Sequence, residues 1–463
     1  MLGRAALGLR NSPALMPAEP LRFLIIGAGP AGTAAATNAA ALGAKVTLVE
    51  SSVVGGAAHL WDCIPSKTMT ATAVRIDSMR NAPRLGLVAA PGSVDSAQLA
   101  NRITTIAGDI NRSWEALLKS QGVDIVTGKA KLAGVNEAVV DGTLRLLFDR
   151  CLLSTGSDPR VPDWAPVDGK RVLTTRDVYD LPEVPERLVV IGSGVTGVEF
   201  VHIFESLGSE VSLVVSRQQI LPHRDPEVAA VLEENFLERG VRLVLGARAV
   251  GIESSSEGVK VRCDDGRVVE GTHALLAIGS IPNTGDLGLE EVGIDADGGF
   301  IKVDENQRTV VPHIYAAGDC TGQMLLSSVA AMQGRKIARH ALGLPVIPID
   351  YSKVSQAIFT EPEIASVGLE EADAAAQGRK VRTTKVPFAA NARAVLQGNP
   401  GGFVKVMSDP ATGVILGGSI VGHRASELIG ILALAVKARV TVSVLVETLM
   451  VHPSLSEALS DAA

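Results

Sequence analysis

A glycine-rich unit that occurs twice in this chain constrains its fold more strongly than any other sequence feature. Each copy has the spacing G-x-G-x-x-G, follows a run of apolar residues and precedes a segment rich in small residues. The six glycines are Gly27, Gly29 and Gly32 in the first copy, and Gly192, Gly194 and Gly197 in the second. Glycine lets a strand turn tightly into a helix and lets the backbone approach a pyrophosphate, whose charge then lies at the helix N-terminus. The repeat therefore predicts two dinucleotide-binding domains of the α/β class.

The residue that ends the next strand differs between the two copies. In the first copy Glu50 stands eighteen positions after Gly32, where a carboxylate can accept hydrogen bonds from ribose hydroxyls. In the second copy Val215 takes the equivalent position and is followed by Ser216 and Arg217. A carboxylate would repel a 2′-phosphate there, whereas Ser216 and Arg217 can bind one. This difference favours NADPH over NADH at the second site; the alternative is that Arg217 is a solvated surface charge.

Matching strands and a long insert predict the domain organisation. The segments 151–156 and 274–279 are apolar strands that close the two units, and the helical range 62–120 accounts for the greater length of the first. After a segment ending at Asp319 and a helix over 327–342, the chain is expected to return to the first domain. The predicted parts are a disordered extension over 1–20, a first dinucleotide-binding domain over 21–160 and 286–345, a second over 161–285, and an α+β domain with antiparallel sheet over 346–463.

Composition excludes several other classes of protein. The formal net charge is -7 and no segment concentrates Lys and Arg, which argues against nucleic-acid binding. Apolar runs such as 429–436 are shorter than the about 20 residues that a membrane-spanning helix needs. The four cysteines are far apart, with no C-x-x-C pair, which excludes a compact zinc site and fits a cytoplasmic location. No metal site is predicted, and small molecules are the expected partners.

One segment carries a specific resemblance to a known family. Residues 55–67 read Gly-Gly-Ala-Ala-His-Leu-Trp-Asp-Cys-Ile-Pro-Ser-Lys. They resemble the redox-active motif of the pyridine nucleotide-disulfide oxidoreductases, the family of dihydrolipoamide dehydrogenase and glutathione reductase. The similarity extends from Phe23 to Glu457. It implies two Rossmann-like domains, the first for FAD and the second for NAD(P), followed by a C-terminal α+β dimerisation domain.

This motif departs from the family pattern at one position. The family has two cysteines five positions apart, whereas here Ala58 takes the first position and Cys63 the second. The resemblance implies that the thiol that would attack a substrate disulfide is missing, and that Cys63 lies against the flavin. The alternative is a Cys63 that packs in the core and has no chemical role.

The resemblance also implies roles for Lys67, Glu199 and Asp319. It assigns Lys67 to the flavin N5 region in an ion pair with Glu199, because a buried lysine needs a carboxylate. A surface position for Lys67 is the alternative. Asp319 is assigned to the ribityl chain of FAD. Further cofactor contacts are expected at Gly56, Thr155, Gly156 and Gly279.

A C-terminal histidine and glutamate match the family's acid-base pair. In this pair Glu457 would orient the imidazole of His452 and hold its protonation state. The family places this histidine over the flavin of the partner subunit, which implies a homodimer. Met450 stands where dihydrolipoamide dehydrogenases usually carry another histidine, and this departure argues against lipoamide as the substrate.

The predicted function is electron transfer from NAD(P)H through FAD directly to a quinone-like acceptor. A subgroup of disulfide-less NAD(P)H:quinone reductases shows the same alanine at the position of Ala58. Dihydrolipoamide dehydrogenase or transhydrogenase activity is the alternative among enzymes. A non-catalytic flavoprotein scaffold is the alternative from another class, although a scaffold has no physical need for Lys67, Glu199, His452 and Glu457.

Overall fold

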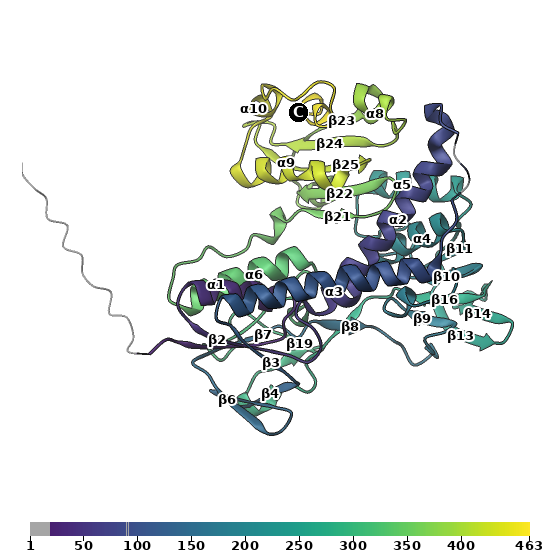
Figure 1. The fold of residues 1–463 in the computed structure, drawn as a ribbon. Coiled ribbons are helices and arrows are strands. Elements are labelled where there is room, and N and C mark those ends of the chain that lie inside the picture. Colours follow the sequence, from purple (N-terminus) through teal and green to yellow (C-terminus); the bar gives the residue numbers. More distant parts are fainter. Residues whose placement is uncertain (1–18, 89, 91) are drawn as a thin grey trace, which may run out of the picture.

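The computed structural model describes residues 19–88, 90 and 92–463. It contains two parallel sheets with their helices and a C-terminal antiparallel sheet, which lies above the other two in the view of Figure 1. The predicted extension over 1–20 lies almost wholly outside the described residues.

The first parallel sheet has the strand order β20-β7-β1-β2-β3. Its strands are β1 (Arg22–Ile26), β2 (Lys45–Glu50), β3 (Asp124–Thr127), β7 (Arg150–Leu153) and β20 (Ile314–Ala316). Helices α1 (Pro30–Ala41) and α6 (Ser327–Ala341) pack together on one face. The other face packs against the meander of β4 (Ala130–Gly134), β5 (Glu137–Val140) and β6 (Leu144–Leu147). Since β20 lies beside β7, the chain returns to this sheet after completing the second one.

The second parallel sheet repeats this plan with the order β12-β11-β10-β16-β9. Its strands are β9 (Val172–Thr174), β10 (Arg187–Ile191), β11 (Glu210–Val215), β12 (Arg242–Leu245) and β16 (His273–Leu276). Helices α4 (Val195–Leu207) and α5 (Pro226–Glu238) cover one face. The other face packs against β13 (Ala249–Ser255), β14 (Gly258–Cys263) and β15 (Val268–Gly271). Between the two units, β8 (Ser157–Pro159) pairs with β17 (Ser280–Pro282).

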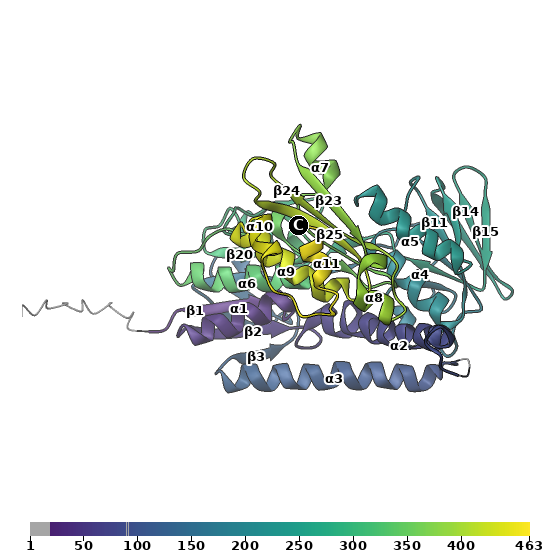
Figure 2. The same ribbon diagram turned by 90° about the horizontal axis from the view of Figure 1, so that it is seen from above.

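The predicted helical insert over 62–120 forms two long helices. They are α2 (Ile64–Asn81) and α3 (Ser96–Ser120), separated by a 3-10 turn over Ala82–Leu85 and an irregular segment. Asp95 caps α3 by accepting a hydrogen bond from the backbone N–H of Gln98. Figure 2 shows both helices running along one side of the molecule. Helix α2 packs against α4 and thereby connects the two dinucleotide-binding units.

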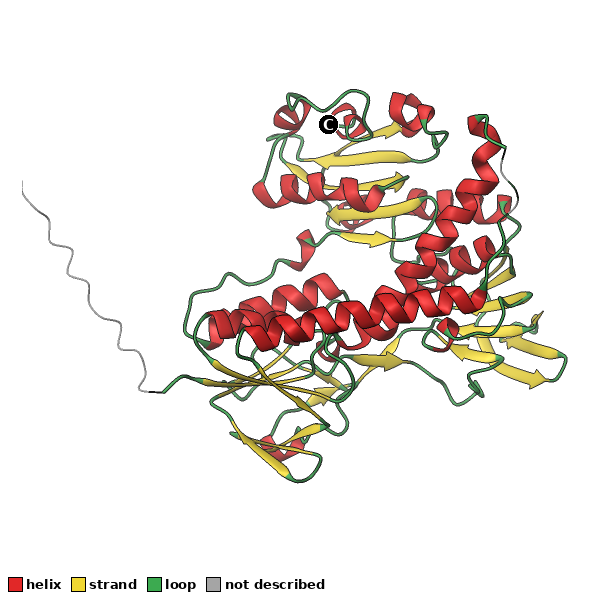
Figure 3. Ribbon diagram, in the orientation of Figure 1, coloured by secondary structure: helices red, strands yellow, loops and turns green. Residues whose placement is uncertain are grey.

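The C-terminal part is built on an antiparallel sheet with the order β21-β22-β25-β24-β23. Its strands are β21 (Gln356–Ile358), β22 (Glu363–Gly368), β23 (Arg382–Pro387), β24 (Phe403–Ser408) and β25 (Ile415–Gly422). Its helices are α7 (Glu371–Ala376), α8 (Ala392–Leu396), α9 (Ala425–Ala438), α10 (Val442–Val446) and α11 (Glu457–Asp461). Figure 3 shows these helices around the sheet. The predicted fold class, two Rossmann-like domains and an α+β domain, is confirmed.

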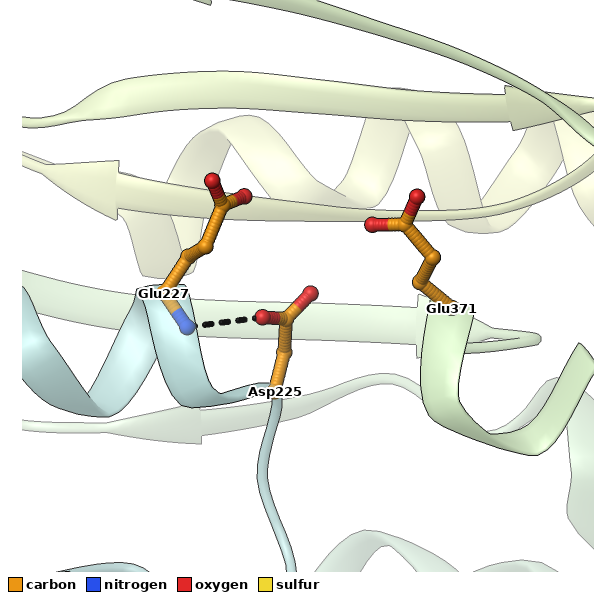
Figure 4. Close-up of side chains that lie close together, drawn as sticks. All are labelled: Asp225, Glu227 and Glu371. Carbon is orange, nitrogen blue, oxygen red and sulfur yellow. Dashed lines mark hydrogen bonds between the residues drawn. The ribbon is translucent and has the colours of Figure 1, made fainter. Parts of the chain in front are cut away.

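An ionic cluster around the buried side chain of Lys405 fixes the C-terminal domain against α5. Figure 4 shows three carboxylates close together, Asp225, Glu227 and Glu371. A group of this kind could hold a cation, but the ammonium of Lys405 already lies among them, 2.7 Å, 2.5 Å and 3.2 Å from their oxygens. Burial lowers the pKa of Lys405, but the hydrogen bonds to Asp225 and Glu227 outweigh this and raise it overall. The cluster is therefore an internal ion pair that joins two domains.

Candidate active site

The first glycine turn leaves no room for side chains where β1 passes into α1. A Cβ atom at Gly32 would lie 2.0 Å from the carbonyl oxygen of Gly27, so only glycine allows this approach. Gly27 has a φ of +101°. By contrast, a Cβ at Gly29 would meet nothing within 4 Å. Open space at Gly29, directly before the N-terminus of α1, is where a pyrophosphate would lie.

Two carboxylates of the first dinucleotide-binding unit, Glu50 and Asp319, are held in place by hydrogen bonds. Glu50 ends β2 and accepts a 2.7 Å hydrogen bond from the backbone N–H of Ala28 in the glycine turn. Asp319 accepts a 2.8 Å hydrogen bond from Ser157, and burial raises its pKa. The structure thus brings Glu50 beside the glycine turn, and Asp319 beside the strand that links the two units. The carboxylates fit the ribose and ribityl hydroxyls of FAD.

Three other predicted contacts with this cofactor lie around the same turn. Gly56 packs on the turn, since a Cβ at this position would lie 3.1 Å from the Cα of Gly29. The hydroxyl of Thr155 donates to the carbonyl oxygen of Asn283 over 2.7 Å. The carbonyl oxygen of Gly156 accepts from the backbone N–H of the same asparagine over 3.0 Å. These contacts hold the end of β7 next to the crevice.

The second glycine turn has nearly the same geometry as the first. A Cβ at Gly197 would lie 1.9 Å from the carbonyl oxygen of Gly192, and a Cβ at Gly194 would meet nothing within 4 Å. Val215 ends β11 and is fully buried, whereas Ser216 and Arg217 beyond it are exposed. Gly279 follows the closing strand β16 in a left-handed conformation. Two exposed polar residues therefore follow β11, and a valine stands at its end where the first unit has the carboxylate of Glu50.

The segment with the missing cysteine forms a π-helical turn over Ala58–Asp62. The backbone N–H of Cys63 donates to the carbonyl oxygen of Ala58 over 3.2 Å, so these two residues lie one turn apart. Two thiols at these positions would lie close together, but Ala58 leaves Cys63 without a partner. All four cysteines of the chain are free. Turns of this type occur frequently at functional sites.

The thiol of Cys63 is held in its neutral form. Its sulfur lies 3.1 Å from the hydroxyl oxygen of Ser327, the first residue of α6. Burial raises the pKa of this thiol, while the contact with Ser327 and the charge of Lys67 lower it by less. Because the thiolate is the reactive form of cysteine, these surroundings disfavour thiol chemistry at Cys63.

A lysine and a glutamate join α2 to α4 beside this turn. The ammonium of Lys67 lies 2.6 Å from a carboxylate oxygen of Glu199, and their side chains are 33% and 8% exposed. The other carboxylate oxygen accepts from the backbone N–H of Phe359 over 3.0 Å. The ammonium also lies 4.8 Å from the centre of the Phe359 ring. The pairing expected from the resemblance is thus present in the geometry.

Four residues were not assigned to this site from the sequence, which are Phe359, Tyr179, Arg176 and Asp62. Phe359 follows β21 in a segment without a recognised motif, and only the fold brings it to Lys67. Tyr179 donates a 2.5 Å hydrogen bond to the backbone oxygen of Trp61, and the guanidinium of Arg176 lies 4.5 Å from the centre of the Trp61 ring. Tyr179 and Arg176 come from the second unit, so no local signal could have placed them against the π turn.

Asp62 was also missed, although it immediately precedes Cys63. Solvent reaches this side chain, yet the surrounding protein raises the pKa of its carboxyl to about 6 by desolvation, against the opposing charge of Arg176. Asp319 raises the pKa further by repulsion between two negative charges. The π turn therefore carries a carboxyl with a raised pKa, which is mostly ionised at pH 7 and takes up a proton as the pH falls through about 6.

The predicted acid-base pair lies on the C-terminal domain. The Nδ1 atom of His452 lies 2.7 Å from a carboxylate oxygen of Glu457. The other oxygen accepts from the backbone N–H of Ser454, and this bond, together with His452, lowers the pKa of Glu457. The imidazole is 74% exposed in the single chain and makes no hydrogen bond to Cys63 or Lys67 within the described residues.

These features define a class of protein: an α/β oxidoreductase with two dinucleotide-binding units whose glycine turns have nearly the same geometry, and with a redox-type π turn next to the first of them. The chain belongs to the pyridine nucleotide-disulphide oxidoreductase family, which it matches over residues 21–334, with the family's dimerisation domain over residues 354–463.

Curated relatives within this family carry two different names. The chain is 43% identical over 458 residues to an NAD(P)H dehydrogenase (quinone) of Mycobacterium tuberculosis, covering 96% of this chain and 93% of that protein. It is 36% identical over 450 residues to a dihydrolipoyl dehydrogenase of Chlamydia muridarum, covering 96% of each. Full-length similarity therefore does not by itself separate the two activities.

Solved structures agree with this assignment. The crystal structure of LpdA from Mycobacterium tuberculosis matches with a TM-score of 0.91 and 43% identity, covering 96% of this chain and 98% of that chain. The HOCl-induced flavoprotein disulfide reductase RclA from Escherichia coli matches with a TM-score of 0.86 and 26% identity, covering 95% and 99%. Among the helices in the described part of the chain, none has the length and apolar character needed to span a membrane.

Proposed function

We propose that this protein is an FAD-dependent NAD(P)H:quinone oxidoreductase that passes electrons from the flavin directly to its acceptor. The observation that carries the proposal is the pairing of Ala58 with Cys63 one π turn apart, because the position of the first thiol holds a methyl group. Disulfide exchange needs one thiolate to attack the substrate and a second thiol to resolve the mixed disulfide. Cys63 alone cannot do both.

The first crevice fits FAD on the evidence of its own residues. Gly27, Gly29 and Gly32 would receive the pyrophosphate at the start of α1, Glu50 the ribose, and Asp319 the ribityl chain. When bound, FAD would supply the capacity to accept a hydride and to return two electrons to an acceptor. Gly56, Thr155 and Gly156 line the same crevice.

The second crevice fits NADPH better than NADH. Gly192, Gly194 and Gly197 would receive its pyrophosphate, and Ser216 and Arg217 would bind the 2′-phosphate. Gly279 lies at the end of the neighbouring strand β16 and borders the same crevice. The buried Val215 in place of an acid removes the charge that would repel a phosphate.

Lys67, Glu199 and the C-terminal pair supply charge and protons in this proposal. Glu199 holds the ammonium of Lys67 at one position, where its fixed positive charge would stabilise negative charge on bound FAD. His452, oriented by Glu457, would protonate the reduced acceptor from the partner subunit.

A homodimer is part of the proposal. The C-terminal domain exposes large apolar side chains on α9, on α10 and in the segment between α10 and His452. They are Leu434, Val444, Val446, Leu449 and Val451, each more than half exposed. Leu449 and Val451 are 98% and 77% exposed, an arrangement that is typical of a protein interface. The match to the family's dimerisation domain covers this region.

Dihydrolipoyl dehydrogenase is the second candidate, because several relatives near 36% identity bear that name. The free, neutral Cys63 and the methyl group of Ala58 argue against it. Anaerobic reduction of the purified enzyme with NADPH, followed by mixing with a quinone, lipoamide or glutathione disulfide, tests the choice. The proposal expects rapid reoxidation by the quinone only, and fast reoxidation by lipoamide would overturn it.

A further inference from the structure

The C-terminal domain reaches the ion pair of Lys67 and Glu199 through Phe359. This residue directly follows β21, whose last residue, Ile358, belongs to the same buried apolar cluster as Phe200 of α4. Successive side chains of an extended chain point to opposite sides. Ile358 therefore anchors the segment in the core, and the ring of Phe359 is turned the other way, toward Lys67.

Phe359 contacts both members of the ion pair, each with a different group. Its backbone N–H donates to one carboxylate oxygen of Glu199 over 3.0 Å, and the other carboxylate oxygen lies 2.6 Å from the ammonium of Lys67. That ammonium lies over the ring, with Nζ 4.8 Å from the ring centre. The distance is within the about 6 Å over which an aromatic face attracts a cation, and the attraction is stronger where water is partly excluded. Both side chains are partly buried.

A second contact matters for Lys67 because its side chain is long and flexible. An ammonium on a four-carbon stem can point in many directions, and one carboxylate restrains it from one side only. Within the part of the chain that the structure describes, its next hydrogen-bond partner is the hydroxyl of Ser66, at 3.5 Å. That distance is at the limit of a hydrogen bond. The ring of Phe359 is therefore the second restraint on the position of this charge.

From these contacts we infer that Phe359 is a positioning residue for the reduction of the flavin by NADPH, and that it acts through Lys67. The inference rests on the FAD and NADPH part of the proposed function and is independent of the acceptor. In this step a C–H bond of the nicotinamide breaks, its hydrogen and two electrons pass to bound FAD, NADP⁺ is formed, and the reduced cofactor gains one negative charge. An ammonium that is already held in place stabilises this charge without reorganising. The C-terminal domain would thus serve its own subunit through Phe359 and the partner through His452.

Substitutions at Phe359 separate the ring from the backbone contact, since every variant keeps the N–H that donates to Glu199. F359L and F359M remove the ring, and F359Y keeps it. In the purified holoenzyme, stopped-flow absorbance follows reduction of the flavin by NADPH with no acceptor present. F359L and F359M should be reduced about fivefold more slowly than wild type, the loss expected for one partly buried cation–π contact, and F359Y should stay within about twofold. The midpoint potential of bound FAD, measured against a redox dye, should be more negative in F359L and F359M only.

A double-mutant cycle with K67M tests whether Phe359 acts through the lysine. K67M keeps an apolar stem against the ring but has no charge, so adding F359L to it should change neither the rate nor the potential. F388L alters a fully buried ring in the core of the C-terminal domain. This control should lower Tm and leave the rate of flavin reduction unchanged.

Two results would overturn the inference about Phe359. One is an F359L enzyme with the wild-type rate and potential, and the other is an F359L effect of equal size with and without K67M. Failure of the proposed function has a different signature, because it concerns the later step with the acceptor. A wild-type enzyme that NADPH reduces but quinones do not reoxidise would overturn the proposed function, while the cycle between Phe359 and Lys67 would still decide the inference.

Discussion

The sulfur of Cys63 lies 3.1 Å from the hydroxyl of Ser327 and has no second thiol to pair with. This relationship separates the chain from enzymes that relay electrons through a disulfide. Burial raises the pKa of the thiol, so it is protonated and poorly nucleophilic at neutral pH. Under the proposed function, electrons that reach the flavin would therefore leave by an outlet that does not involve sulfur.

Replacing Cys63 with serine should leave quinone reduction within about twofold of wild type, because the hydroxyl can take the place of the thiol beside Ser327. Steady-state kcat/KM for NADPH and a quinone provides the measurement, with Cys263→Ser, which alters a buried thiol on β14 outside the candidate site, as the control. A loss of activity in C63S that the control does not share would mean that this sulfur takes part in the reaction.

Glu199→Gln should slow reduction of the flavin by NADPH about tenfold, equal to about 1.4 kcal/mol of transition-state stabilisation. The glutamine can still accept from the backbone of Phe359, but without the carboxylate charge it no longer holds the ammonium of Lys67 firmly at its position beside the flavin crevice. Stopped-flow absorbance of the flavin measures this step. Glu186→Gln, on the exposed surface of the same domain, should have no effect, and an equal effect there would refute a specific role for the ion pair.

Changing Val215 to Glu together with Arg217 to Ala should reverse the preference for NADPH. The new carboxylate repels the 2′-phosphate and can accept hydrogen bonds from the ribose hydroxyls of NADH. We expect the ratio of kcat/KM for the two nucleotides to change by at least about tenfold, or about 1.4 kcal/mol. A wild-type enzyme that already prefers NADH tenfold would contradict the electrostatic argument.

The ionic cluster at Lys405 should make stability depend on pH in the acid range. Hydrogen bonds from Lys385 and Lys405 lower the pKa of Glu227 from 4.5 to about 2. A carboxyl whose pKa is lower in the folded state stabilises the protein above pH 4.5, and this contribution is lost as the pH falls toward 2.

Glu227→Gln should therefore flatten the fall in Tm over that pH range, while Glu238→Gln, on an exposed position of the same helix, should not. If the Tm of wild type and the Tm of E227Q fall equally over this pH range, the ion pair contributes nothing to the pH dependence of stability. Lys405→Met, which leaves a buried carboxylate unpaired, should cost about 3 kcal/mol at neutral pH.

Leu449→Asp should convert the dimer to a monomer and abolish quinone reduction, since a charge would then lie in the proposed interface. Light scattering at working concentrations measures the mass, and Leu147→Asp, at an exposed position on β6 of the first domain, is the control. An active monomer in either protein would contradict the proposal that His452 acts on the partner's flavin.

Much of this fold could be predicted because its signals are local. The glycine turns were found from their spacing, and the strands that follow them were expected to end at Glu50 and Val215, which are the last residues of β2 and β11. The strands β21 to β23 were not predicted, since they are short or interrupted by prolines and polar residues. Their identity as strands depends on pairing within the sheet: β22 pairs with β25, β23 with β24, and β21 with β22.

The sequence motif predicted only those residues of the candidate site that lie together in one continuous segment. The positions of Ala58, Cys63 and Lys67 follow from a continuous segment, and Glu199 came from the family resemblance. Phe359 and Arg176 reach the same site from other domains, and nothing in their own neighbourhoods signals this. Tertiary contacts of that kind arise from topology, which local patterns do not contain.

The most direct test of the account compares acceptors for NADPH-reduced enzyme under anaerobic conditions. The account predicts that a quinone reoxidises the flavin rapidly, in wild type and in C63S alike, and that lipoamide and glutathione disulfide do not. Rapid turnover with lipoamide that disappears in C63S would contradict it, because a thiol relay would then operate despite Ala58.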